Sequence, residues 1–116
     1  MNDYDEMWDF NLVVNSNLKD INRIHPLKQR DVTALVNELQ KDDNINRIII
    51  FGSALDMRCN WYSDLDVYVE TRDKEKRVCL PYDDLEGEID LVRDIDHNSR
   101  LYKEIDKTGL LIWERG

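Results

Sequence analysis

Residues 47–70, RIIIFGSALDMRCNWYSDLDVYVE, contain two contrasting segments on either side of a turn. The run RIIIF at 47–51 is β-branched and aromatic and is too short for a helix, so it predicts a buried strand. Gly52 and Ser53 end that strand. The run SDLDVYVE at 63–70 alternates polar and apolar residues, which predicts a second strand with one face on the core.

The flanking sequence predicts helices and two further strands. Apolar residues at helical spacing predict an amphipathic helix over about 27–41. The run EIDLVR at 88–93 alternates again and predicts a third strand. Ser99 predicts the start of a helix that runs to about Thr108 and stops at Gly109, and LLIW at 110–113 predicts a last short strand. We therefore predict an α/β (α+β) fold, a small mixed β-sheet with helices packed on it.

Three carboxylates are the main candidates for chemistry. Asp64 and Asp66 are two residues apart on one predicted strand, so both face the same side, about 7 Å apart. Asp90 lies on the polar side of the next predicted strand, with Glu88 as the alternative on that face. If the strands are neighbours, the charges converge, and a hard cation such as Mg²⁺ or Mn²⁺ would relieve their repulsion. The competing interpretation is the solvated face of an edge strand.

The turn before these carboxylates predicts a phosphate site. Gly52 lets the backbone bend tightly and approach a ligand, and Ser53 offers a hydroxyl and a backbone N–H. We expect a short helix over 54–58 whose first turn begins at Ser53, so that its unpaired N–H groups face an anion. Ser63, directly before Asp64, is a further nucleotide-binding candidate. Ser53 could equally be a simple helix cap, which does not exclude phosphate binding.

Side chains near these candidates have both a ligand-binding and a structural interpretation. A base could stack on an aromatic ring and a phosphate could meet a cation, yet loop packing and solvation are the common roles of such residues. The aromatic candidates are Trp61 and Tyr62, and the cationic candidates are Arg58, Arg72 and Lys74. Tyr68 and Glu70 extend the face of Asp64 and Asp66 and could touch a nucleotide, but we expect surface roles for them. We also expect surface roles for His25 and His97.

Composition limits the possible classes of protein. The 116 residues, 41% of them hydrophobic, fit one domain, so we expect 1–116 to be a single domain in which 1–26 form an N-terminal extension. The net charge of −9 argues against direct nucleic-acid binding and against an anionic membrane surface, but permits a basic protein partner. Two cysteines in no metal-binding pattern, and no secretory or transmembrane segment, favour a cytoplasmic protein.

These motifs resemble the nucleotidyltransferase superfamily typified by DNA polymerase beta and, more narrowly, the minimal nucleotidyltransferases, the MNT-type antitoxins. Residues 51–70 resemble the family's G-S-x(n)-D-x-D element, EIDLV at 88–92 its third acidic strand, and 94–115 its closing helix and strand. The resemblance covers roughly residues 27–115. It implies that Asp64, Asp66 and Asp90 are catalytic metal ligands and that Gly52 and Ser53 bind the triphosphate.

The resemblance also implies a reaction. A nucleoside monophosphate, usually AMP, would move from a triphosphate such as ATP to a hydroxyl group, with release of pyrophosphate and with Mg²⁺ or Mn²⁺ as cofactor. In MNT antitoxins the acceptor is often a tyrosine of a partner HEPN-domain ribonuclease, which is thereby silenced. Because the chain is too short for a separate acceptor-binding domain, we expect a HEPN-type toxin or a homo-oligomer to complete the acceptor site.

The segment after Ser53 departs from the family's common pattern. Many members carry an Arg soon after Gly-Ser and a second Gly a few residues on, whereas this chain has Ala54, Leu55, Asp56 and Met57 there. The departure keeps an alternative open, in which a catalytically inactive nucleotidyltransferase fold acts as an antitoxin or binding module through protein–protein contact. An acidic scaffold without a ligand is a third interpretation.

Overall fold

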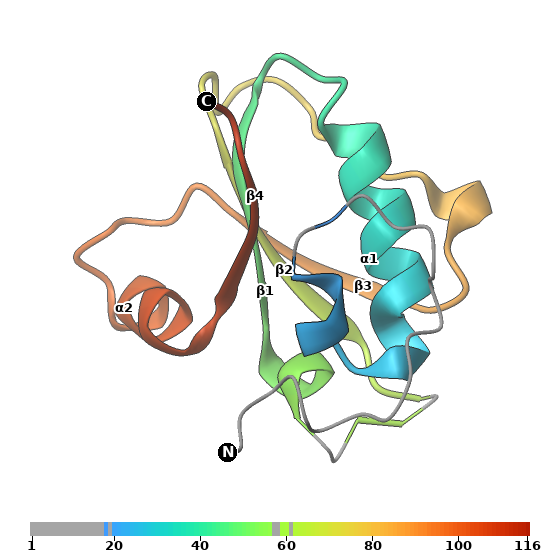
Figure 1. Ribbon diagram of the computed structural model, residues 1–116. Coiled ribbons are helices and arrows are strands. Elements are labelled where there is room, and N and C mark those ends of the chain that lie inside the picture. The colour runs from blue at the N-terminus through green and yellow to red at the C-terminus, as the bar shows by residue number, and fades with distance from the viewer. Residues whose placement is uncertain (1–17, 19, 57–58, 61) are drawn as a thin grey trace.

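The sheet has four strands within the described part of the chain, in the order β3-β2-β1-β4 (Figure 1). The computed structural model describes residues 18, 20–56, 59–60 and 62–116. The strands are β1 (Ile45–Phe51), β2 (Leu65–Thr71), β3 (Ile89–Arg93) and β4 (Leu110–Glu114). Strand β1 is antiparallel to both of its neighbours, β2 and β4, whereas β2 and β3 run parallel. This arrangement confirms the predicted mixed sheet.

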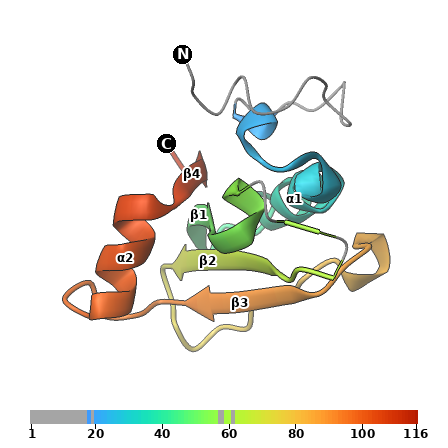
Figure 2. The same cartoon turned by 90° about the horizontal axis from the view of Figure 1, so that it is seen from below.

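The two helices lie on opposite sides of this sheet. Figures 1 and 2 both show the sheet between α1 (Pro26–Leu39) and α2 (Arg100–Thr108). The larger core lies on the α1 side, where Val32, Leu35 and Val36 of the helix are completely buried with the inward-facing residues of the central strands. The α2 side has a smaller cluster made of Ile49, Tyr68, Tyr102 and Ile105.

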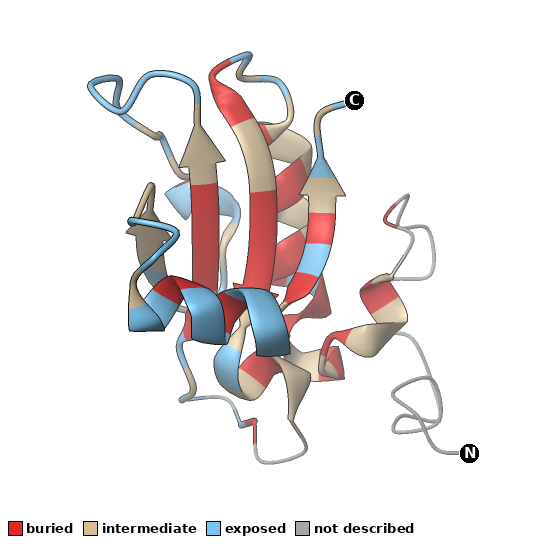
Figure 3. Ribbon diagram, turned by 90° about the vertical axis from the view of Figure 1, so that its left-hand side faces the viewer, coloured by how far each residue is buried: buried red, intermediate tan, exposed pale blue. Residues whose placement is uncertain are grey.

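Strand β2 is buried on both faces at its centre, as Figure 3 shows. Leu65, Val67 and Val69 face the larger core, as their alternation predicts. The prediction of a surface role for Tyr68 is wrong, because its side chain is 0% exposed. Tyr102 of α2 packs edge-on against the Tyr68 ring, with 5.7 Å between the ring centroids. The α2 face of the sheet is therefore polar only toward its ends.

The helix boundaries follow local capping chemistry. Helix α1 begins at Pro26, and the Nδ1 atom of His25 accepts the N–H of Leu27 at 3.1 Å, so His25 is a capping residue and not an ordinary surface residue. At α2, the hydroxyl of Ser99 accepts the N–H of Tyr102 at 3.1 Å. This cap confirms the predicted start of the second helix.

The region before α1 is only partly described. A 3-10 helix covers Ile21–Arg23, and the side chains of Leu18, Ile21 and Ile24 are buried in the larger core. The rest of the predicted N-terminal extension, residues 1–17 and 19, lies outside the described residues. None of the described helices has the length and the apolar character needed to cross a membrane.

Candidate active site

The predicted glycine turn lies directly against one of the candidate carboxylates. Strand β1 ends at Phe51, which pairs with Asp66 of β2. Gly52 follows with φ +77°, a conformation that residues with a side chain rarely adopt. A Cβ at this position would lie 2.2 Å from Oδ2 of Asp66. Glycine therefore lets the backbone pass beside the carboxylate, and no other residue fits without displacing it.

The turn itself is tighter and shorter than the sequence suggested. A 3-10 helix, Gly52–Leu55, stands where a short helix over 54–58 was expected. The N–H of Asp56 donates to the carbonyl of Ser53 at 2.9 Å, and Asp56 is already extended, with φ −132° and ψ 146°. The helix ends there because the backbone leaves the helical region.

The start of α1 holds this turn in place. Ala54 is completely buried, and its carbonyl accepts the N–H of His25 at 2.7 Å. The residue that caps α1 therefore also ties the turn to that helix. Half-buried Ser53 lies within the same fixed segment.

The sheet brings Asp66 and Asp90 together. They are direct partners in the parallel pairing of β2 with β3. Paired residues on adjacent strands lie about 4.8 Å apart and point to the same face. Asp64 is exposed and precedes Leu65, the first residue of β2, whereas Glu88 precedes β3. The register thus places Asp90, and not Glu88, beside Asp66.

The electrostatics of Asp66 reflect this crowding. Burial raises the pKa of its carboxyl group, and the neighbouring carboxyl of Asp90, which also hydrogen-bonds to it, raises the pKa further. Asp64 contributes in the same direction. Ionising Asp66 in these surroundings therefore costs free energy, and a bound cation would offset that cost.

The carboxylates suit a hard cation by their chemistry, although they are not preassembled around one. Among the residues that the structure describes, no group of three or more His, Cys, Asp or Glu side chains has the spacing of a metal site. The cluster offers oxygen ligands only, and such ligands bind Mg²⁺ or Mn²⁺ while leaving positions for water and phosphate. The repulsion of Asp66 by Asp90 and Asp64 also favours a cation, because a positive charge would offset it.

The predicted nucleotide contacts in the loop before Asp64 are only partly described by the structure. The hydroxyl of Ser63 accepts the N–H of Asn60 at 3.1 Å, so it closes the turn just before Asp64. Tyr62 is 95% exposed, so loop packing, one of its two interpretations, does not apply, and base stacking stays a prediction. Trp61 and Arg58 lie outside the described residues.

The remaining cationic candidates lie away from the carboxylates. Arg72 follows the last residue of β2, six positions beyond Asp66, which corresponds to about 20 Å along an extended strand. Lys74 lines a hollow of about 640 Å³ at that same end of β2. The structure therefore does not bring Arg72 or Lys74 together with Asp66.

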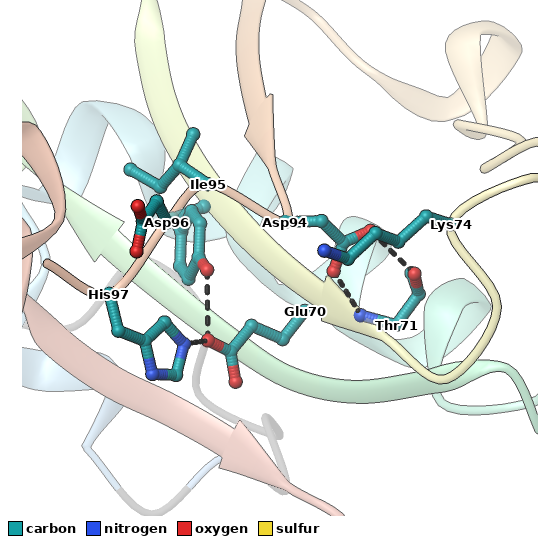
Figure 4. A pocket seen from close by; sticks show the side chains of 8 residues that line it. Glu70, Thr71, Lys74, Asp94, Ile95, Asp96 and His97 are labelled. Atoms are coloured by element: carbon teal, nitrogen blue, oxygen red, sulfur yellow. Dashed lines mark hydrogen bonds and ion pairs between the residues drawn. The ribbon is translucent and has the colours of Figure 1, made fainter. Parts of the chain in front are cut away.

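A polar network borders this distant hollow (Figure 4). Glu70 accepts hydrogen bonds from Arg47 Nε and Tyr68 Oη, each at 2.9 Å, and contacts Nε2 of His97. Burial alone would raise the pKa of Glu70, but the hydrogen bonds from Arg47, Tyr68 and His97 outweigh it and leave the pKa below its usual value. The His97 ring also stacks on Tyr102 at 4.0 Å. Glu70 and His97 therefore connect the sheet to α2. His97 is a surface residue as expected, with its side chain 60% exposed, whereas the Glu70 side chain is only 18% exposed, which corrects the expectation of a surface role for Glu70.

Sequence patterns gave no indication of one buried acid near the candidate site. Asp31 of α1 is 3% exposed, and its two oxygens accept the backbone N–H groups of Glu86 and Gly87, just before β3. Asp31 stands among charged and polar neighbours in the sequence, so only its position on the buried side of the helix distinguishes it.

Comparison with known proteins adds one finding. Residues 33–116 match the family model described as Polymerase beta, Nucleotidyltransferase. The matched region includes the glycine turn, all three candidate carboxylates, the four strands and α2. No curated protein and no solved structure matched the chain.

Proposed function

Because the chain belongs to the polymerase beta nucleotidyltransferase family, we propose that it transfers a nucleoside monophosphate from a nucleoside triphosphate to a hydroxyl acceptor. We propose ATP as the donor, so that AMP is the transferred group. The observation that carries this proposal is the junction of β1, β2 and β3, where Gly52 abuts Asp66 and Asp90 is its direct partner.

We assign the binding roles to residues of this junction. Asp64, Asp66 and Asp90 would hold divalent cations, Mg²⁺ or Mn²⁺, which would neutralise the triphosphate and make the acceptor hydroxyl more acidic. Gly52 and Ser53 would present backbone N–H groups to the phosphates, and Ser63 would keep the loop before Asp64 in place.

The reaction needs positioning and charge neutralisation more than a reactive side chain. The acceptor oxygen would form a bond to the α-phosphorus, while the bond from that phosphorus to the bridging oxygen breaks. Pyrophosphate would leave, and the hydroxyl proton would pass to solvent. The cluster of carboxylates beside a side-chain-free turn is consistent with this division of roles.

The acceptor site would be completed by another chain. We propose a tyrosine of a HEPN-type toxin as acceptor, so that transfer neutralises the toxin, with a second copy of this chain as the other source of the acceptor. The net charge of −9 is compatible with a basic partner.

The direct test is transfer of label from ATP labelled at the α-phosphate, with Mg²⁺ or Mn²⁺, to the product of the adjacent gene. Labelled partner protein that disappears in the Asp66→Asn variant supports the proposal. Labelled GTP, CTP and UTP in parallel identify the donor. Absence of label on any acceptor, together with no change in melting temperature on adding Mn²⁺ and ATP, contradicts it.

A catalytically inactive antitoxin is the second candidate. It is favoured by the segment after Ser53, which has Ala54, Leu55 and Asp56 in place of an early cation. In this case an Asp64→Ala/Asp66→Ala double variant would still neutralise the toxin. A double variant that binds the toxin without neutralising it excludes this candidate.

A further inference from the structure

The buried carboxylate of Asp31 joins α1 to the segment that leads into β3. The Asp31 side chain is only 3% exposed. Its Oδ1 accepts the N–H of Glu86 at 2.8 Å, and its Oδ2 accepts the N–H of Gly87 at 2.9 Å. The two N–H groups lie 55 and 56 residues further along the chain. One side chain therefore fixes two consecutive peptide units far away in sequence.

Close packing at Gly87 accompanies these bonds. A Cβ at residue 87 would lie 3.3 Å from Nζ of Lys28 and 3.5 Å from Oδ2 of Asp31. Lys28 is itself 3% exposed. The backbone at 86–87 can approach α1 this closely because residue 87 has no side chain.

The pinned segment continues directly into the candidate active site. The carbonyl of Glu88 accepts the N–H of Leu65 at 2.9 Å, and Ile89 pairs with Leu65. The next pair along the two strands is Asp66 with Asp90. Gly87, whose N–H Asp31 holds, lies only three residues before Asp90 in the chain.

The hydrogen bonds to Asp31 help to fix the register in which β3 pairs with β2. A shift of β3 by one residue would turn Asp90 toward the opposite face of the sheet and bring an apolar neighbour beside Asp66. Burying a carboxylate is costly unless its oxygens are hydrogen-bonded, and apolar packing alone could not hold two N–H groups. The use of an acid at this buried helix position is explained if the backbone at 86–87 must be held in one place.

We propose that Asp31 is a positioning residue that sets the register of β3 and thereby holds Asp90 beside Asp66. The inference rests on the proposed function for its catalytic consequence. Asp31 itself, on the α1 side of the sheet, contacts neither nucleotide nor cation in this proposal and acts through the backbone of the segment before β3.

The test uses Asp31→Asn, which keeps the shape of the side chain but turns one acceptor oxygen into a donor facing an N–H group. Gln29→Met is the matched control, because Gln29 is a buried polar residue of the same helix whose Nε2 bonds the carbonyl of Ile24 instead. Hydrogen exchange of individual amides measures how firmly residues 86–93 are held. The affinity for Mn²⁺ in the presence of a non-hydrolysable ATP analogue measures whether the candidate active site is intact.

In Asp31→Asn we expect faster exchange across 86–93, with β1 still protected, and Mn²⁺ affinity weaker by about tenfold. Excess Mn²⁺ should restore the transfer rate, and the continued protection of β1 distinguishes this effect from a general loss of stability. Gln29→Met should leave exchange at 86–93 and Mn²⁺ affinity unchanged. Unchanged exchange in Asp31→Asn, or faster exchange without weaker Mn²⁺ binding, overturns the inference.

The unmodified protein supplies a second measurement should Asp31→Asn not fold. Its Glu86 and Gly87 amides must be as protected as the amides of β3, and unprotected amides there overturn the inference. An unmodified protein that binds no Mn²⁺ with the ATP analogue overturns the proposed function, and the inference about Asp31 with it. Failure confined to the variant removes the inference alone.

Discussion

Asp66 and Asp90 are paired residue for residue across the two parallel strands of the sheet. Their carboxyl groups are close enough to hydrogen-bond, and burial together with this neighbour raises the pKa of Asp66. The native structure therefore stores a local electrostatic cost when both groups are ionised. In a nucleotidyltransferase domain such a cost is useful if a bound cation offsets it, because the free energy released then contributes to cation binding.

The first prediction is that Asp66→Asn raises stability while abolishing transfer. Because the folded-state pKa of Asp66 is raised, the unfolded chain loses this proton first as pH rises, and folding stability falls between the unfolded and folded pKa values. The asparagine variant lacks that penalty. Its melting temperature without metal should exceed that of the unmodified protein at neutral pH, and the difference should vanish below the ordinary pKa of 3.8. Calorimetry across pH checks this, and a variant that melts lower at neutral pH contradicts it.

The second prediction is the opposite sign at Asp94, for the same chemical change. Burial would raise the pKa of Asp94, but hydrogen bonds from Thr71 and Arg93 outweigh it and lower the pKa. The ionised group therefore stabilises the fold above its unfolded pKa, and this contribution is lost as pH falls through the folded pKa. Asp94 has φ +49°, which asparagine tolerates, so Asp94→Asn removes the charge and one hydrogen-bond acceptor without adding backbone strain. Urea unfolding at neutral pH should show a loss of about 1–2 kcal/mol, and an unchanged midpoint would contradict the prediction.

The third prediction compares the effects of removing the negative charge of Asp90, in β3, and of Glu88, just before it. Glu88 and Asp90 share one face of the alternation, yet only Asp90 pairs with Asp66. Asp90→Asn should lower the transfer rate by about a hundredfold or more, since lost cation contacts cost several kcal/mol of transition-state stabilisation. Glu88→Gln should leave the rate within about twofold, because the backbone carbonyl of Glu88, and not its side chain, bonds Leu65. Equal losses in both variants would show that the register argument is wrong.

The alternation of polar and apolar residues predicted that Asp66 and Asp90 lie on the polar faces of their strands, because which face a residue occupies depends only on the two-residue period of a strand. The sequence could therefore place Asp66 and Asp90 on one polar face once β2 and β3 were neighbours. It could not reveal that Tyr68 on the same face is buried, since that depends on where α2 packs, and α2 has only two buried side chains, Tyr102 and Ile105.

Long-range backbone contacts were equally inaccessible to pattern analysis. The role of Asp31 depends on two amides more than fifty residues away, and no local period encodes such a contact. The short helix expected after Ser53 failed for a related reason. The backbone beyond Leu55 is extended at Asp56, where nothing in the sequence marks an end to the helix.

The last prediction concerns Gly52, where conformation and space both exclude a side chain. A methyl group there would meet Oδ2 of Asp66 at 2.2 Å, and φ +77° adds backbone strain of about 1–3 kcal/mol. Gly52→Ala should therefore displace the Asp66 carboxylate, lower the melting temperature and weaken Mn²⁺ binding together with transfer. Gly116→Ala is the matched control, because a Cβ at that position has no atom within 4 Å, and both quantities should stay unchanged. A Gly52→Ala protein that binds Mn²⁺ with ATP as tightly as the unmodified one would show that the closeness of this turn to Asp66 is not needed for the site.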